Sequence, residues 1–324
     1  MILVSEQTAR TLVSIDDAIA AVEACFVALE TGDGTVFPVV SEHGTSPRSS
    51  MVLKSGCLRT GDDVMLGVKL GTYWPDNVAA GLESHGSTVL LIDDATGMPR
   101  ALVGASHLTA LRTAAADAVA VKYLAAPDAE TLGIVGAGHQ ARFELQAVAR
   151  VRSIARVRIW ARDAERAAAF AAEARVAGFA DVAAASLEET VSTSRIVVAV
   201  TSAHEPLVQR EWVAAGTHVS SMGSDIVGKQ ELDPQLVASS TLFADVVAQA
   251  LTIGEFQHAA AAGSIDASRV RAIGEVAAGR APGRTRSDEI TVFDSSGVAA
   301  QDLAIAHVAL RNATQHGSAV ELTW

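Results

Sequence analysis

The stretch TLGIVGAGHQA, from Thr131 to Ala141, decides the fold class of this chain. Its apolar run, Leu132 to Val135, meets a G-x-G-x-x-A pattern, and residues 142 to 150 then follow a helical pattern. A strand, a glycine turn and a helix in this order are typical of the opening of a dinucleotide-binding unit. Gly136 permits the tight turn, and Gly138 lets backbone N–H groups approach a pyrophosphate at the positive end of the helix. Because the pattern alone also occurs by chance, its specificity comes from this context.

The size and composition of the chain are those of a globular enzyme. Its 324 residues allow two domains with a large core, and 49% apolar residues with a mean hydropathy of +0.28 exclude a disordered chain. The net charge of −12, without a basic block, argues against a nucleic-acid partner, although a local pocket can still attract small anions. No apolar segment approaches the roughly 18 residues of a membrane span, so we expect no membrane partner and a cytoplasmic location.

Two further classes of site lack support in the sequence. The nine histidines show no spacing typical of metal ligands, and Cys25 and Cys57 are too few for a disulfide framework. We therefore expect no metal site and two free thiols. Serine-hydrolase chemistry has no support either, because the G-x-S-x-G pattern is missing.

The first third of the chain predicts a helix and then strands joined by short turns. Residues 13 to 30 form an amphipathic helical pattern, with Ser14 or Asp16 as the candidate N-cap. The turn Asp94-Ala-Thr-Gly97 predicts a hairpin, so this sheet is antiparallel or mixed. A helix is then expected from Thr109, its candidate cap, to residue 125. The strand-like runs are Thr35–Val40, Ser50–Lys54, Val64–Tyr73, Ser87–Asp93 and Arg100–Val103.

From Leu132 the pattern changes to strands alternating with helices, which predicts a parallel sheet. Helices are expected at residues 163 to 177 and 298 to 311, and the second of these could return to the first domain. The expected strands are Leu132–Val135, Arg156–Trp160, Arg195–Thr201, Thr217–Met222, Leu242–Ala244 and Ile290–Phe293.

Two basic positions could carry chemistry in the first half of the chain. Arg112 and Thr113 fall within the first turn or so of the expected helix, where an arginine either reaches an anion or lies at the surface. Lys69 shares a strand face with Met65 and Gly67. It is either solvated at a sheet edge or points into a cleft, where it would bind a carboxylate or have a lowered pKa.

Polar residues also follow several strands of the expected parallel sheet. Asp225 lies after one of them, at the edge where ligands bind, and is either an acid/base group or the cap of a turn. The run Asp294-Ser-Ser-Gly297 precedes a helix, and its simplest role is an N-cap. At the end of the second strand, Arg162 favours the 2′-phosphate of NADP, whereas Asp163 favours the ribose hydroxyls of NAD. Together they give NADPH a slight advantage over NADH.

Taken together, these motifs resemble the ornithine cyclodeaminase/mu-crystallin family. The resemblance spans nearly the whole chain in the order of the family, and its most specific elements are LTALRTAA and GAGxQA. The matching segments are GVKLGTYWPDN (67–77), STVLLIDDATGMPRALV (87–103), LTALRTAAADAVA (108–120), GIVGAGHQARFEL (133–145), SMGSDIVGKQEL (221–232) and ITVFDSSGVAAQDLA (290–304).

The resemblance implies an α/β fold, in which a Rossmann domain with a doubly wound parallel sheet is inserted in an α+β domain. The α+β domain, residues 1–120 plus 298–324, would bind substrate and form a homodimer. The Rossmann domain, residues 121–297, would bind NAD(P)H. The partner implied is a small imine or amino acid that carries a carboxylate.

The resemblance also implies roles for individual residues. Asp225 matches the aspartate that has an acid/base role in the cyclodeaminases, and Lys69 is our second candidate for a catalytic acid. The resemblance implies that Lys69 and Arg48 hold a substrate carboxylate, and Lys54 and Ser296 are our further candidates for substrate contacts. The cofactor would contact Arg112, Thr113, Gly136, Ala137, Gly138, His139, Gln140, Ala161, Arg162, Thr201, Ser202, Met222, Gly223, Ser224, Lys229 and Ser295.

Two departures from the family pattern bear on the reaction. The cyclodeaminases carry an acidic residue shortly after the substrate arginine, whereas Ser49–Leu58 contains no acid and offers Lys54. They also carry a Cys-Pro pair after the aspartate, where this chain has Ile226-Val227. We therefore expect the imine-reductase branch, whose members reduce iminosuccinate, pyrroline-2-carboxylate or iminopropionate, the last as alanine dehydrogenases. The alternatives are ornithine cyclodeamination to proline plus ammonia, and a ligand-binding protein that holds NADPH.

Overall fold

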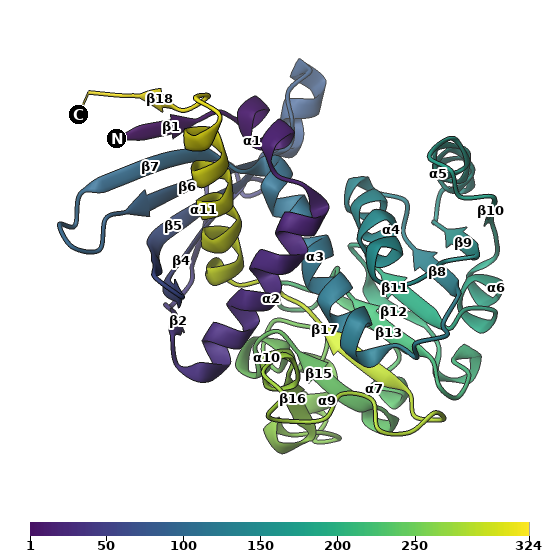
Figure 1. The fold of residues 1–324 in the computed structure, drawn as a ribbon. Helices are drawn as coiled ribbons and strands as arrows, with labels where there is room; N and C mark the ends of the chain where they lie inside the picture. Colours follow the sequence, from purple (N-terminus) through teal and green to yellow (C-terminus); the bar gives the residue numbers. More distant parts are fainter. Residues whose placement is uncertain (324) are drawn as a thin grey trace. The chain divides into compact units, whose positions relative to one another are not determined.

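The structure is a computed structural model that describes residues 1–323 and divides the chain into two compact units (Figure 1). The first unit comprises Met1–Arg112 and the segment that begins at Val298. The second unit is Thr113–Gly297. The division thus lies at Arg112, somewhat before the predicted boundary at residue 120. Among the described residues, no helix is both long and apolar enough to cross a membrane.

A mixed sheet forms the core of the first unit. Its strand order is β18-β1-β7-β6-β5-β4-β2, with β3 paired to β4, and the β1–β7 pair is parallel while the other pairs are antiparallel. The strands are β1 (Ile2–Val4), β2 (Gly34–Val36), β3 (Val40–His43), β4 (Ser50–Thr60), β5 (Asp63–Tyr73), β6 (His85–Ile92), β7 (Pro99–Gly104) and β18 (Val320–Glu321). The prediction of a single strand at 35–40 is wrong. Two separate strands, β2 and β3, occur instead, and the segment between them contains Pro38, which has no N–H to donate to a sheet.

Helices cover one face of this sheet. The C-terminal helix belongs to the first unit and packs against α2, β4 and β5. Ser14 caps α2 in a capping box with Asp17, which confirms Ser14 rather than Asp16 as the cap. The helices are α1 (Glu6–Leu12), α2 (Ile15–Thr31), the short 3₁₀ helix η1 (Pro75–Ala80) and α11 (Ala299–Gln315).

The two faces of the sheet differ in exposure. Met65, Gly67 and Lys69 of β5 are buried on the face that α11 covers. The alternate side chains, among them Val68 of β5 and Leu90 of β6, stay partly exposed in a single chain. The second face is therefore apolar without being fully buried.

Helix α3 (Ser106–Leu124) begins earlier than the sequence predicts. The carboxylate of Glu6 caps it, because its two oxygens accept the N–H groups of Ser106 at 2.9 Å and of His107 at 2.7 Å. The prediction that Thr109 is the cap is therefore wrong. Arg112 consequently lies beyond the first turn, so the prediction that it stands at a helix terminus is also wrong.

A parallel, doubly wound sheet forms the second unit, as predicted. Its order β10-β9-β8-β11-β13-β17 is that of a Rossmann fold, and β15 and β16 extend it beyond β17. The strand order reverses between β8 and β11, and ligands bind at the carboxyl ends of strands at such a point. The strands are β8 (Thr131–Val135), β9 (Arg156–Trp160), β10 (Asp181–Ala184), β11 (Ile196–Ala199), β13 (His218–Ser221), β15 (Thr241–Ala244), β16 (Val270–Ala272) and β17 (Thr291–Asp294).

Helices and a small ribbon complete this unit. A parallel pair, β12 (His204–Val208) and β14 (Gln230–Leu232), stands apart from the main sheet and was not predicted. The helices are α4 (His139–Val151), α5 (Ala164–Val176), α6 (Leu187–Ser192), α7 (Pro234–Ser239), α8 (Val247–Ala250), α9 (Gln257–Ala261) and α10 (Ile273–Ala277), with 3₁₀ turns η2 (Arg210–Trp212) and η3 (Ala267–Arg269).

Candidate functional site

The glycine turn between β8 and α4 has the geometry that a pyrophosphate requires. Gly136 has a φ of +129°, and a Cβ there would lie 2.5 Å from the carbonyl oxygen of Val200. Gly138 is the N-cap of α4 and provides no side chain to bind the first N–H groups of the helix. A Cβ on Gly138 would meet no atom within 4 Å, so the space in front of the helix is open. These features fit a dinucleotide whose pyrophosphate accepts from the N-terminus of α4.

Side chains of α4 hold this turn in place. Arg142 Nη1 donates to the carbonyl oxygens of Ala137 at 3.1 Å and Gly138 at 3.0 Å, while its Nε pairs with Glu173 at 2.6 Å. Gln140 Nε2 donates to Glu144 Oε1 at 2.8 Å. The turn is therefore rigid, and His139, at the first position of α4, is exposed beside it.

Arg162 and Asp163, the two residues that bear on cofactor choice, follow β9 and have different environments. Asp163 caps α5, with its Oδ1 accepting the N–H of Glu165 at 3.0 Å. Arg162 is exposed. A hollow of about 440 Å³ adjoins this strand end and is lined in part by Trp160, Ala161 and Ala164. The side chain of Asp163 is thus used within the protein, whereas Arg162 faces solvent.

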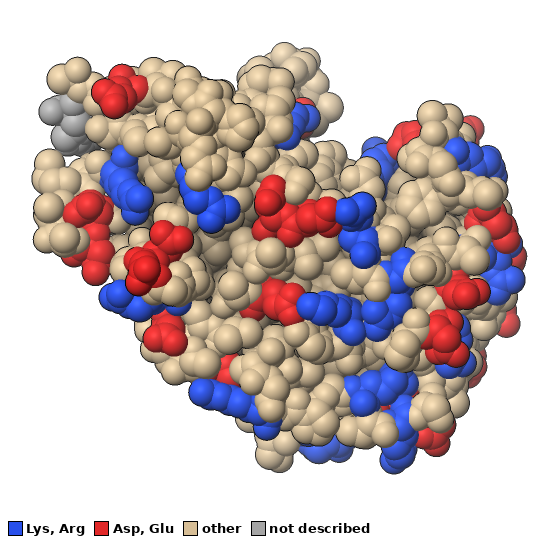
Figure 2. All heavy atoms as spheres, viewed as in Figure 1, with Lys and Arg blue, Asp and Glu red and all other residues tan. Residues whose placement is uncertain are grey.

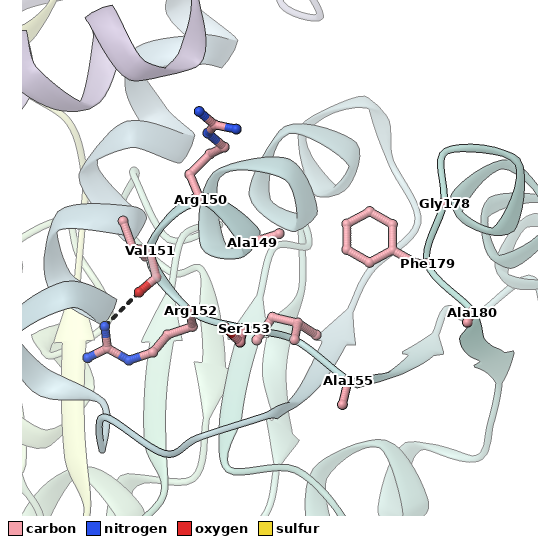
Figure 3. A pocket seen from close by; sticks show the side chains of 10 residues that line it. Ala149, Arg150, Val151, Arg152, Ser153, Ala155, Gly178, Phe179 and Ala180 are labelled. Atoms are coloured by element: carbon pink, nitrogen blue, oxygen red, sulfur yellow. Dashed lines mark hydrogen bonds between the residues drawn. The ribbon is translucent and has the colours of Figure 1, made fainter.

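A larger hollow of about 570 Å³ lies elsewhere in the second unit (Figure 3). Residues 149–155, from the end of α4 to the start of β9, line it together with Gly178–Ala180. Within it Arg152 donates to the carbonyl oxygen of Val151 at 2.8 Å (Figure 3). Because this is the amino end of β9, it is not where a parallel sheet binds its ligand.

The segment after β13 contains the predicted acid/base residue. Asp225 pairs with Lys229 Nζ at 2.7 Å, and its side chain is 53% exposed. Lys229 also donates to the carbonyl oxygen of Gly223 at 3.1 Å, so both residues belong to one loop. Of the two serines after β17, Ser295 donates to Asp245 and Ser296 to Gln249, each at 3.0 Å.

Two buried glutamates support segments that are predicted to contact the cofactor, among them Met222–Ser224, which the family resemblance implies at the nicotinamide. Glu231 on β14 accepts the N–H of Thr201 at 2.6 Å and the N–H of Gly223 at 2.9 Å. Glu255 Oε2 lies 2.6 Å from the hydroxyl oxygen of Ser224, with which it forms a hydrogen bond. Sequence reasoning missed both glutamates, because a lone Glu in an apolar run resembles any surface acid until its burial is known.

Lys69 in the first unit is the centre of a buried ionic cluster. Strand β5 lies between β4 and β6, which excludes the alternative of a solvated lysine at a sheet edge. Lys69 Nζ donates to Asp302 Oδ1 at 2.9 Å, and Arg112 Nε donates to the same oxygen at 3.0 Å. Arg112 Nη1 also donates to Gln301 Oε1 at 2.9 Å. Asp302 and Gln301 come from α11, and sequence reasoning missed both.

The protonation of this cluster follows from its burial and its charges. Burial lowers the pKa of Lys69 to about 8, even though Asp302 counteracts it. Burial alone would raise the pKa of Asp302, but Arg112 and Lys69 hold it below its usual value. Within residues 1–323, Asp302 Oδ2 and Gln301 Nε2 are buried without a hydrogen-bond partner. The cluster can therefore accept an additional donor and an additional acceptor.

Lys54 is the cross-strand neighbour of Lys69. The two residues stand opposite each other in the antiparallel β4–β5 pair, so their side chains share one face of the sheet. The charge of Lys54 acts on Lys69 and lowers its pKa further. Arg48, by contrast, is exposed near η1, where it pairs with Asp76 at 2.6 Å and lies outside this cluster.

The face shown in Figure 2 carries charges of both signs. On this face, lysines and arginines alternate with aspartates and glutamates. No group of three or more histidine, cysteine, aspartate or glutamate residues with the arrangement of a metal site occurs among residues 1–323. The pair formed by the buried Lys69 and the half-buried Lys54 is therefore the feature of the first unit that best fits an anionic ligand.

Known proteins resemble this chain over its full length. The iminosuccinate reductase of Paracoccus denitrificans is 41% identical over 322 residues, or 99% of each chain. Its crystal structure in complex with NAD⁺ superposes with a TM-score of 0.93 at 40% identity and covers 100% of this chain and 99% of that one.

Two further solved structures are similar. An archaeal alanine dehydrogenase dimer with bound NAD has a TM-score of 0.93 at 32% identity, covering 100% and 99% of the two chains. The Δ¹-pyrroline-2-carboxylate reductase of Thermococcus litoralis, in complex with NADH and L-proline, has a TM-score of 0.92 at 32% identity, covering 99% and 100%. The family model of the ornithine cyclodeaminase/mu-crystallin family matches residues 1–317. The chain therefore belongs to the ornithine cyclodeaminase/mu-crystallin family.

Proposed function

We propose that this chain reduces an imine next to a carboxylate to an L-amino acid, and that its substrate is a dicarboxylic imine of the iminosuccinate type. The observation that carries the proposal is the pair of lysines, Lys54 and Lys69, on one sheet face. Bound NAD(P)H would supply the hydride. The full-length similarity to an iminosuccinate reductase supports the same substrate class.

The charge of the Lys69 cluster favours a substrate with two carboxylates. Lys54, Lys69 and Arg112 provide three positive charges, whereas Asp302 is the acidic residue that acts on Lys69. Opposed residues of an antiparallel pair have Cβ atoms about 5 Å apart, so two ammonium groups can each bind one carboxylate of a four-carbon substrate. Asp302 Oδ2, a buried acceptor without a donor in the described chain, suits the N–H of the iminium or of the product amine.

Two residues are candidates for proton transfer to the imine nitrogen. Lys69 has a pKa of about 8 and can therefore give up a proton near neutral pH. Asp225 is half-exposed and paired with Lys229, and we assign it the acid or counter-charge role that the family resemblance implies. Arg48 lies outside the Lys69 cluster, so a role in carboxylate binding would require it to leave Asp76.

We also propose that NADPH is used in addition to NADH. The exposed Arg162 is placed at the strand end where a 2′-phosphate binds, and Asp163 is occupied as a helix cap. The similar structures contain NAD⁺, NAD or NADH, so both cofactors belong in the test.

Lys54→Gln is expected to lower kcat/KM with oxaloacetate plus ammonia by about 100-fold, because the second carboxylate loses its ionic partner. Turnover of pyruvate plus ammonia, which offers one carboxylate, should change by less than about threefold. The measurement is the decrease of reduced-nicotinamide absorbance with NADH and with NADPH. Lys122→Gln, at an exposed lysine of α3, is the matched control.

The substrate panel also separates the competing functions. Besides oxaloacetate plus ammonia and pyruvate plus ammonia, the panel contains pyrroline-2-carboxylate and ornithine. Turnover of ornithine is followed by an assay for released ammonia. If pyruvate plus ammonia oxidises the cofactor and oxaloacetate plus ammonia does not, the protein is an alanine dehydrogenase and the proposed dicarboxylic substrate is wrong. Ammonia release from ornithine at constant absorbance would establish cyclodeamination, and tight cofactor binding without any turnover would leave a ligand-binding protein.

We propose a homodimer that forms through the partly exposed face of the first-unit sheet. Val68 and Leu90 lie on this apolar face, and a similar structure is a dimer. Sedimentation is expected to give twice the chain mass of 33.5 kDa, and Leu90→Asp should shift the protein to monomers. Val176→Asp, at a side chain that is 92% exposed on α5, should leave the mass unchanged. A monomeric wild-type protein would contradict the proposal.

A further inference from the structure

The carboxyl groups of Glu231 and Glu255 meet at one hydroxyl group. Ser221 Oγ lies 2.8 Å from Glu231 Oε2 and 3.1 Å from Glu255 Oε2. Ser221 has a single hydroxyl proton, so it can donate to only one of these oxygens at a time. Both glutamates are at most 1% exposed, and neither contacts a lysine or arginine in the described structure.

Glu231 joins the segments that follow two neighbouring strands. Its Oε1 accepts the N–H and the hydroxyl of Thr201, just after β11, at 2.6 and 2.8 Å. Its Oε2 accepts the hydroxyl of Ser221 and the N–H of Gly223, at the end of β13, at 2.8 and 2.9 Å. Burial raises the pKa of Glu231, whereas these four hydrogen bonds favour its ionised form and counteract that rise.

Glu255 has a different set of neighbours. Its Oε1 accepts the N–H of Leu232 at 2.7 Å. Its Oε2 accepts the N–H of Glu231 at 2.9 Å and lies 2.6 Å from the hydroxyl oxygen of Ser224. A proton on Oε2 could therefore be donated to Ser224. Burial and the charge of Glu231 raise the pKa of Glu255 to about 8, which places the proton on this residue at neutral pH.

The other charged groups around the pair favour the same protonation. From β17, Asp294 Oδ2 accepts the N–H of Glu255 at 3.0 Å, and burial with the charge of Asp245 raises its pKa well above the usual value. On the loop, Lys229 donates to Gly223 and to Asp225 instead of to the glutamates. The charged side chains nearest to Glu255, those of Glu231 and Asp294, are therefore both acidic, and both favour a protonated Glu255.

We propose that Glu231 and Glu255 share one proton and act as positioning residues, which hold the Thr201 and Met222–Ser224 segments in the form that binds the nicotinamide. With the proton present, Glu231 is the carboxylate that ties these segments together and Glu255 is a neutral donor to Ser224. Loss of the proton puts two negative charges on one serine and separates the segments. This inference rests on the proposed contact of these segments with the nicotinamide.

The test is the pH dependence of NADH binding, measured by calorimetry without substrate. The NADH Kd of the wild type is expected to rise about tenfold from pH 7 to pH 9, because Glu255 loses its proton near pH 8. Glu255→Gln should remove this dependence and bind as the wild type does at pH 7, since its amide can donate to Ser224. Glu231→Gln should weaken binding at every pH, because its amide N–H₂ would face backbone and hydroxyl donors.

A second measurement does not involve the cofactor. A carboxyl group whose pKa is raised on folding holds its proton in the native state while the unfolded chain has lost it, so stability falls between about pH 4.5 and 8. The thermal midpoint of Glu255→Gln should therefore fall less than that of the wild type as the pH rises to 9. Glu211→Gln, at an exposed glutamate of the same unit, should behave as the wild type.

Three results would overturn the proposal: a wild-type Kd that is constant from pH 7 to 9, an unchanged pH dependence in Glu255→Gln, or full affinity in Glu231→Gln. Wild-type protein that does not bind NADH or NADPH at any pH would instead contradict the proposed cofactor. The two failures are thus distinguishable.

Discussion

Lys69→Met is expected to lower kcat/KM with oxaloacetate plus ammonia by about 1000-fold and to leave the fold intact. Removal of one partner of a buried ionic contact with a ligand costs about 4 kcal/mol, which corresponds to this factor. The fold should persist because Asp302 keeps its bond to Arg112 at 3.0 Å. The NADH Kd should change by less than about threefold, since the side chain is proposed to bind the substrate.

The pH profile gives this prediction a second readout. Lys69 binds a carboxylate only in its protonated form, so wild-type kcat/KM should fall above pH 8, where the ammonium group loses its proton. Measurement at saturating NADH separates this effect from any change in cofactor binding. Lys69→Met should show no such fall, and a variant with more than a tenth of wild-type kcat/KM would exclude the assigned role.

Asp302→Asn is the matched comparison, and it should affect stability more than Lys69→Met. It leaves Lys69 and Arg112 without the carboxylate that they share, and an uncompensated buried charge costs about 3–5 kcal/mol. A thermal scan of the two variants tests this order. Equal midpoints would show that Asp302 does not balance the cluster.

The second large effect is expected at the glycine turn, where Gly136→Ala should abolish cofactor binding and destabilise the protein. The backbone at Gly136 has a φ of +129°, and the added Cβ would lie 2.5 Å from the Val200 carbonyl oxygen. A non-glycine residue in such a conformation costs about 1–3 kcal/mol before the steric clash is included. The NADH Kd should rise by at least about 100-fold, as measured by calorimetry.

Gly138→Ala is the matched control for the turn. Its Cβ meets no protein atom within 4 Å, and its φ of −79° is open to alanine, so the thermal midpoint without cofactor should stay unchanged. The NADH Kd should still rise about tenfold, because the methyl group stands where the pyrophosphate is proposed to bind. Normal NADH binding in Gly138→Ala would place the pyrophosphate elsewhere.

The sequence predicted the elements that local patterns define. The glycine turn, the alternation of strands and helices and the Ser14 cap depend on neighbours within a few residues, and the structure contains all three. The cap of α3 could not be predicted, because Glu6 lies 100 residues before the helix that it caps. Arg112 was therefore placed one turn too close to a helix terminus.

The candidate site was predictable only in part, for a related reason. A lone lysine in an apolar strand identified Lys69, but its partner Asp302 lies 233 residues further along the chain. Glu231 and Glu255 are 24 residues apart, in segments without a recognisable pattern. Contacts of this kind depend on which elements the fold brings together, and periodicity within one element does not contain that information.

The placement of α11 in the first unit has a consequence for the order of folding. The second unit, Thr113–Gly297, is one continuous piece of chain and can reach its parallel sheet from its own residues. The first unit cannot bury Met65 or give Lys69 its counter-charge until the ribosome has produced α11. During synthesis, the part of the apolar sheet that α11 covers therefore stays exposed to water while the second unit forms. This interval is when the nascent chain most needs protection from aggregation.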